Sequence, residues 1–313
     1  MAVTTIATGE ALSNTGTLRQ GQDDKGRRPA FAGPLVRALP SSSRALATLL
    51  DRLRQGAGAY ALHETIPAAR PALLASIYRA LGGQLFVITP TADAAERMFA
   101  DLLYYLEEDE PRTVRLLRSR EETVGAIESP SERSARMALL AELADDTPGI
   151  ILAPMGALRQ YVIPREAFRR ERFTLRVNDE AGWDATLARL YRLGYRRCDV
   201  VSAAGEYAVR GGILDVFSSS ADMPTRIEFF GDTVESVRPF HLESQRSEGS
   251  VESIEIVPWT EIPRDDALRA RIIERFNGPQ NVATALRAYL DSGADVPEPW
   301  LSLAFDERET VLD

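Results

Sequence analysis

The side chains that most often carry nucleophilic or metal chemistry are scarce in this chain of 313 residues. Cys198 is the one cysteine, and His63 and His241 are the two histidines. A catalytic thiol needs a base close to it in space, and a zinc site needs several cysteine or histidine ligands held together. We therefore expect no catalytic residue and no metal site. A single cysteine also excludes an intrachain disulfide.

Lysine is almost absent, which limits nucleotide and covalent chemistry in the same way. Lys25 is the only lysine, so arginine supplies nearly all of the positive charge. A phosphate-binding loop places a lysine on the phosphates of a nucleotide, and Schiff-base chemistry also requires a lysine. These reactions are therefore disfavoured, and no cofactor is expected.

The charge balance bears on the partners of the chain. The net charge is −9, from 37 basic and 46 acidic residues. Binding to DNA without regard to sequence requires many phosphates to be neutralised, which an acidic chain does poorly. No apolar run approaches the roughly 18–20 residues that a membrane span needs. We expect a cytoplasmic protein with no membrane partner and with indirect DNA contact at most.

The first half of the chain has the pattern of an α/β layer. Residues 1–40 lack a sustained apolar period and are expected to form a mobile tail. Residues 41–167 alternate helical periods with short apolar runs, which indicates a largely parallel sheet. The expected strands are 59–62, 84–90, 114–117 and 149–154, and the expected helices begin near Ser41–Ser43, Pro67, Ala92 and Ser131.

Strands with a period of two follow, which is typical of a β-rich α+β domain at 168–258. The expected strands are 173–177, 207–210, 213–217, 226–230, 234–240 and 251–257, with a helix at 183–193. Helical patterns at 265–276 and 281–290 predict a smaller helical segment within 259–313.

The strand around Phe230 predicts a candidate interaction surface. Ile227 and Phe229 would face inward, so that Arg226, Glu228 and Phe230 share the outer face. Arginine and aromatic residues are enriched among interface anchors. The residues alone leave a second interpretation open, in which a loop covers Phe230 or both faces are buried. Two glycines after Arg210 predict a tight turn that presents this arginine at a strand end.

Four sequence blocks between Gly194 and Ser247 carry a family resemblance. They are Gly-Tyr-Arg-Arg-Cys-Asp at 194–199, Gly-Glu-Tyr-Ala-Val-Arg-Gly-Gly-Ile-Leu-Asp-Val-Phe at 205–217, Arg-Ile-Glu-Phe-Phe-Gly-Asp at 226–232 and Ser-Gln-Arg-Ser at 244–247. Their order and spacing resemble the bacterial transcription-repair coupling factors and, more distantly, UvrB. UvrB has Arg-Gly-Asp where this chain has Arg210-Gly211-Gly212.

This resemblance implies a fold of three pieces. The first is a degenerate P-loop-like (RecA-like) α/β lobe, and the second is an inserted UvrA-binding α+β domain. The third is a remnant helical or α/β lobe at 259–313 that packs on the first. Family residues that face the repair protein UvrA match Arg210, Arg226 and Phe230. Arg197 matches an arginine that UvrB uses for the same contact, although coupling factors vary there. A further UvrB arginine is replaced by Ala208, so that contact is expected to be lost.

The stretch that matches the UvrB phosphate loop runs from His63 to Arg70 and has no glycine. Ala69 stands at the lysine position and Arg70 at the hydroxyl position, while Glu64 would add negative charge beside a phosphate. The resemblance therefore implies a lobe that keeps its sheet and no longer binds a nucleotide.

The resulting expectation is a non-catalytic interaction module of transcription-coupled nucleotide excision repair. It would recruit UvrA by imitating UvrB, and other domains of a full-length coupling factor are further partners that the resemblance implies. Two alternatives remain open at this point: a UvrB-like ATPase or helicase fragment, and a direct DNA-binding repair module.

Overall fold

The computed structural model of the chain describes residues 5–7, 39, 42–56, 58–62, 65–106, 113–119, 129–291 and 300–312. Two compact units are present, one within 1–119 and 146–157 and the other within 120–145 and 158–313. The fold is mixed α/β with three separate sheets among the described residues. No described helix has the length and apolar character needed to cross a membrane.

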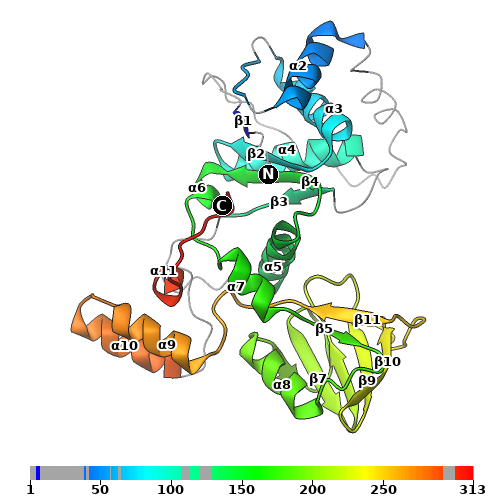
Figure 1. The fold of residues 1–313 in the computed structure, drawn as a ribbon, viewed down its shortest axis with the longest axis vertical. Coiled ribbons are helices and arrows are strands. Elements are labelled where there is room, and N and C mark those ends of the chain that lie inside the picture. The colour runs from blue at the N-terminus through cyan, green and yellow to red at the C-terminus, as the bar shows by residue number, and fades with distance from the viewer. Residues whose placement is uncertain are drawn as a thin grey trace, which may run out of the picture. The chain divides into compact units, whose positions relative to one another are not determined.

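The first unit is built on a parallel sheet (Figure 1). Its strand order is β1 (Thr5–Ala7), β2 (Gln84–Thr89), β4 (Gly149–Pro154) and β3 (Val114–Leu116), and all three pairings are parallel. The sequence-based strands at 84–90, 114–117 and 149–154 are thereby confirmed. Leu85, Val87, Ile150 and Leu152 are buried, as expected for short apolar strands in a covered parallel sheet.

Helices supply the rest of the core of this unit. They are α2 (Arg44–Gln55), η1 (Pro67–Ala69), α3 (Arg70–Leu81) and α4 (Ala92–Leu106), and α6 (Met155–Leu158) follows β4. Ser43 caps α2, because its hydroxyl accepts a hydrogen bond from the Leu46 amide at 3.3 Å. Gly82 and Gly83 end α3 with positive φ angles of 65° and 73°.

Two expectations for this unit are corrected. Residues 59–62 were expected to form a buried strand, but they have no regular structure and Leu62 is 44% exposed. This run holds two alanines, and its Tyr60 packs back on α2, with the hydroxyl donating to the Arg52 carbonyl at 3.4 Å. Within the expected mobile tail, residues 5–7 pair with β2 at the sheet edge, while the remainder of 1–38 lies outside the described residues.

The second unit contains helices that come before, within and after a β-rich region of the sequence. They are α5 (Pro130–Ala144), α7 (Arg165–Glu171), α8 (Trp183–Arg192), α9 (Asp266–Arg275), α10 (Gln280–Asp291) and α11 (Leu301–Ala304). The buried Arg136 of α5 forms an ion pair with the buried Glu261 at 2.8 Å, and Glu261 also accepts from the Ile163 amide. Arg169 of α7 donates to the carbonyl of Ala144 at 2.9 Å. The compact unit thus takes in α5 and the helices α9 to α11 together with the β-rich region.

The β-rich region contains two sheets. The five-stranded sheet has the order β10 (Thr233–Pro239), β9 (Thr225–Phe230), β8 (Ile213–Val216), β7 (Glu206–Arg210) and β6 (Arg196–Cys198). The second sheet pairs β5 (Phe173–Arg176) with β11 (Ser253–Ile256) in antiparallel fashion. The alternating sequence predicts all of these strands except β6. That strand pairs in parallel with β7, so the sheet is not wholly antiparallel as its pattern indicated.

One face of the five-stranded sheet carries the core. Figure 1 shows α8 and the β5–β11 pair beside this sheet. Leu190 and Leu193 from the helical side, and Leu175 and Ile256 from the two-stranded sheet, pack with Ile227 of β9 in one buried cluster. This buried face is the inner face of the sheet, and the opposite face is its outer face.

Candidate protein-binding surface

Strand register determines which candidate residues share the outer face. Ile213 of β8 lies opposite both Arg210 of β7 and Glu228 of β9. Directly opposed residues share a face, and residues two apart along a strand do so as well. Arg210, Arg226 and Phe230 consequently belong to one face, the face that does not carry the buried Ile227. The structure brings these three expected site residues together on the same side of the sheet.

Phe230 is the most exposed large apolar side chain of the described residues. Phe230 is the last residue of β9 and precedes the turn to β10, in which Gly231 has a φ of 60°. The Phe230 residue is 77% exposed. The neighbouring Phe229 is buried and packs edge to face against Trp183, with ring centroids 5.2 Å apart. No loop of the described chain covers Phe230, so the second interpretation of this residue is wrong.

Arg210 lies at the end of β7 and is exposed. The turn that follows needs its glycines: Gly211 has a φ of 61°, and a Cβ at Gly212 would lie 2.7 Å from the carbonyl oxygen of Phe229. The Arg210 guanidinium donates through Nη2 to the backbone carbonyl of Asp199 at 3.0 Å. This single bond orients the side chain and leaves other N–H groups of the guanidinium for a partner.

Arg226 differs from Arg210 because its guanidinium is engaged inside the domain. Nε and Nη2 donate to the two carboxylate oxygens of Asp215 at 2.7 and 2.8 Å. The guanidinium carbon lies 4.9 Å from the centre of the Phe240 ring, and only 18% of the Arg226 side chain is exposed. The hydrogen bond to Asp215 raises the pKa of Arg226 above its usual value. Arg226 is thus part of the folded framework of the outer face.

Arg197 is not brought together with the other three. It is exposed on β6, but its register partner is Tyr207, whereas Ala208 is the residue that shares the face of Arg210. Arg197 therefore points toward the inner side of the sheet at its β6 edge.

Two acidic residues of this sheet were missed by sequence reasoning. Asp215 is buried opposite Arg226, and Glu206 is buried at the start of β7. Glu206 accepts hydrogen bonds from the amides of Ser202 and Ala203 at 2.8 and 3.1 Å and pairs with Arg196. Burial acts to raise the pKa of Glu206, but these hydrogen bonds outweigh it and hold the pKa below the ordinary value. A carboxylate within an alternating apolar strand, as at Asp215, was the available signal.

Cys198 lies near the same carboxylate. Burial, together with the negative charge of Glu206, raises the pKa of the Cys198 thiol. A raised pKa keeps the thiol protonated and weakens it as a nucleophile. In the part of the chain that the structure describes, no three His, Cys, Asp or Glu side chains gather as metal ligands would.

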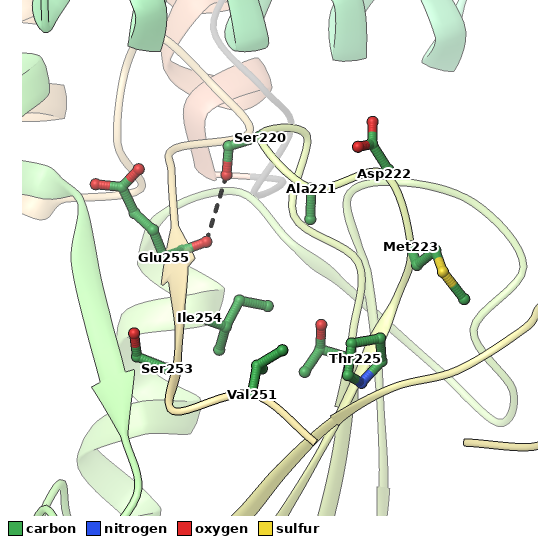
Figure 2. Close-up of a pocket in the computed structure, with 10 residues that line it drawn as sticks. Ser220, Ala221, Asp222, Met223, Thr225, Val251, Ser253, Ile254 and Glu255 are labelled. Atoms are coloured by element: carbon green, nitrogen blue, oxygen red, sulfur yellow. Dashed lines mark hydrogen bonds between the residues drawn. The ribbon is translucent and has the colours of Figure 1, made fainter. Parts of the chain in front are cut away.

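A pocket of about 380 Å³ lies elsewhere in this region, between the 220–223 loop and β11. Figure 2 shows Thr225, Val251 and Ile254 toward its centre, with the carboxylates of Asp222 and Glu255 toward its margin. Ser220 donates to the backbone carbonyl of Glu255 at 3.4 Å. This lining shares no residue with the outer-face candidates.

The stretch that matches the UvrB phosphate loop lies in the other unit, and its His63 and Glu64 are outside the described residues. Ala69 ends the η1 turn and Arg70 begins α3, so these two residues stand at a helix N-terminus. A helix start is the usual place for a phosphate. However, Ala69 has no group that could replace the lysine of a working loop, and Pro71 lacks an amide N–H.

Comparison with known proteins concerns both the β-rich region and the chain as a whole. Residues 173–261 match the family described as UvrB interaction domain. The chain is 33% identical to the transcription-repair-coupling factor of Staphylococcus aureus (strain USA300) over 190 residues, and 30% identical to that of Bacillus subtilis (strain 168) over 233 residues. These alignments cover 61% and 74% of this chain but 16% and 20% of the relatives, so the chain spans at most about a fifth of their length. The chain is accordingly an N-terminal, UvrB-like module of the transcription-repair coupling factor kind, with a UvrB interaction domain at 173–261.

Proposed function

We propose that this chain is a non-catalytic docking module that recruits UvrA in transcription-coupled nucleotide excision repair by presenting a UvrB-like surface. The observation that carries the proposal is the exposed Phe230, which lies on the same face of the sheet as the exposed Arg210 within a UvrB interaction domain. A large aromatic side chain in water is unfavourable unless a partner covers it, and arginine with an aromatic ring is typical of interface anchors.

The role that we propose for each residue follows from its contacts. Phe230 would enter an apolar pocket of UvrA, and Arg210 would pair with a carboxylate of UvrA through its remaining N–H groups. Arg226 supports the same face from within the domain. Arg197 would contribute only if UvrA reaches around the β6 edge, because its side chain belongs to the other side of the sheet.

A binding titration with purified UvrA tests this proposal. Wild type is compared with Arg210→Ala and Phe230→Ala, each checked for folding by thermal unfolding, and with Arg176→Ala as a control. Arg176 is an exposed arginine on β5, outside the five-stranded sheet. We expect the first two variants to lose about 1–3 kcal/mol of binding free energy and the control to bind like wild type. Folded wild type that does not bind UvrA would refute the proposed function.

The lobe in the first unit is proposed to be a degenerate P-loop-like domain without nucleotide. Its parallel sheet with flanking helices supports an α/β lobe, while Ala69 and Arg70 stand where a working loop would have its lysine and hydroxyl. Thermal unfolding with and without Mg-ATP tests this, since a ligand that binds the folded state raises the transition temperature. We expect no shift, and an ATP-dependent rise would instead favour the ATPase alternative.

The direct DNA-binding alternative makes a different prediction. Duplex binding would have to show a steep dependence on salt, because phosphate neutralisation releases counterions. We expect no measurable duplex affinity at either low or physiological salt, in keeping with the net charge of −9.

A further inference from the structure

The guanidinium of Arg226 holds a loop as well as a carboxylate. Beyond its two bonds to Asp215, Nη1 donates to the backbone carbonyl of Gln245 at 3.3 Å. Gln245 lies in the middle of the segment from His241 to Glu248, which we call the outer-face loop. Since Arg226 points from the outer face of the sheet, this bond places the loop over that face, at the opposite end of β9 from Phe230.

The outer-face loop has a defined conformation. The Gln245 amide donates to the His241 carbonyl at 2.8 Å, and the Glu248 amide donates to the Pro239 carbonyl at 2.7 Å. Gln245 has a φ of 55°, a left-handed conformation that is uncommon for a residue with a side chain and requires surrounding contacts to hold it. The bond from Arg226 is one such contact.

A small apolar cluster adjoins this loop, because its Phe240 directly precedes His241 and contacts the Arg226 guanidinium. Phe240, Val201 and Ala208 are buried there, with Cys198 and Phe217 partly buried against them. Arg226 stacks over the Phe240 ring while Asp215, whose side chain is 4% exposed, fixes it from the strand side. These contacts hold the end of the outer face that carries Arg226, whereas the other end exposes Phe230 and Arg210.

The fork edge of Arg226 formed by Nε and Nη2 is already occupied by Asp215. A bidentate bond from the same edge to a carboxylate of a partner would require the Asp215 bonds to break, leaving a buried carboxylate without its cation. Such a buried unpaired charge is strongly unfavourable. The contacts of Arg226 thus favour an internal role over a direct one.

We infer, on the basis of the proposed function, that Asp215 and Arg226 are positioning residues and that the outer-face loop they hold is a second contact element for UvrA. The loop presents Leu242, which is 36% exposed, and the exposed Arg246. These side chains suit a partner surface with an apolar patch next to a carboxylate. Docking then uses two separated contacts on one face, Phe230 with Arg210 at one end and the loop at the other.

The test combines UvrA titration with hydrogen exchange of the amides in 241–248, using the whole chain. Asp215→Asn removes the charge that holds Arg226 and nearly preserves the shape of the side chain at position 215. We expect faster exchange in the loop and a loss of UvrA affinity of about tenfold, similar to the loss in Arg226→Ala. Glu206→Gln is the matched control, because it also removes a buried carboxylate paired with an arginine in this sheet; it is expected to leave exchange in the loop unchanged.

The opposite result is equally defined. If Arg226 contacts UvrA directly, Asp215→Asn frees its guanidinium, and UvrA affinity stays the same or rises, which would overturn the inference. Should Asp215→Asn fail to fold, Arg226→Lys replaces it, since lysine lacks the planar fork that spans Asp215 and Gln245. Weaker UvrA binding in this variant with unchanged loop exchange would also overturn the inference.

Two surface variants test the loop itself without disturbing the framework. Leu242→Ala and Arg246→Ala are expected to weaken UvrA binding several-fold each, with Arg176→Ala as the control, and full retention of affinity in both would show that the loop is no contact element. If wild type fails to bind UvrA, the proposed function is wrong, and loop exchange in Asp215→Asn still decides whether Asp215 and Arg226 position the loop.

Discussion

Replacement of Phe230 by alanine tests whether this residue serves recognition or packing, because the two roles predict different effects on UvrA binding and on the free energy of unfolding. Full burial of a phenylalanine side chain contributes roughly 1.5–3 kcal/mol. Because 77% of Phe230 is exposed in the free chain, nearly all of this contribution is still unused before docking. Burial of the exposed part by UvrA would therefore contribute about 1–2 kcal/mol, which corresponds to a 5- to 30-fold change in Kd.

The Phe230→Ala variant should thus bind UvrA about 5- to 30-fold more weakly while its free energy of unfolding changes by less than about 0.5 kcal/mol. Isothermal titration gives the first quantity and urea denaturation the second. Tyr191→Ala is the matched control, because Tyr191 is also an exposed aromatic residue of this domain, 53% exposed on α8. The reasoning is refuted if Phe230→Ala binds like wild type, or if Tyr191→Ala weakens binding by the same factor.

Three further predictions concern stability. Arg136→Ala leaves Glu261 buried without this partner and should lower the free energy of unfolding by about 3–5 kcal/mol in urea denaturation; a loss below 1 kcal/mol would contradict a structural role for the pair. Since the folded-state pKa of Glu206 lies below 4.5, its stabilising contribution is present above pH 4.5 and is lost as the pH falls through the folded value; acid titration of unfolding should show this, and Glu206→Gln should flatten it. Gly205→Ala should lower the melting temperature by several degrees, because Gly205 has a φ of 82° and a Cβ there would lie 2.2 Å from the Trp259 ring; an unchanged melting temperature would count against this packing.

Local patterns predict much of this fold, because the deciding interactions are local. In two strands the apolar pattern of the sequence matches the burial pattern of the structure: the continuous run at 84–90 and the alternating strand at 225–230. The type of strand and its inward face therefore follow from the residues. The prediction of a strand at 59–62 was wrong because a run of only four residues cannot show whether a partner strand exists. β6 was missed for the converse reason: three residues with two arginines have no apolar period, and pairing with β7 makes the strand.

The shared face of the candidate residues was predictable, but their contacts were not. Alternation indicates that Arg226 and Phe230 share a face, and the structure agrees. It carries no information on which side chain of that face meets another from a distant strand. The bidentate pair between Asp215 and Arg226, and the bond from Arg226 to Gln245, arise from strand register and loop return, which are set by the tertiary fold.

The antiparallel pairing of β5 with β11 has a consequence for how such a domain can be carried by a longer chain. These two strands are the first and last of the β-rich region, and Phe173 is paired with Ile256. The points where the polypeptide enters and leaves are therefore neighbours, so the host needs to span only the short distance between two adjacent strands. A domain whose two ends are adjacent can be inserted into a surface loop of another domain at little entropic cost.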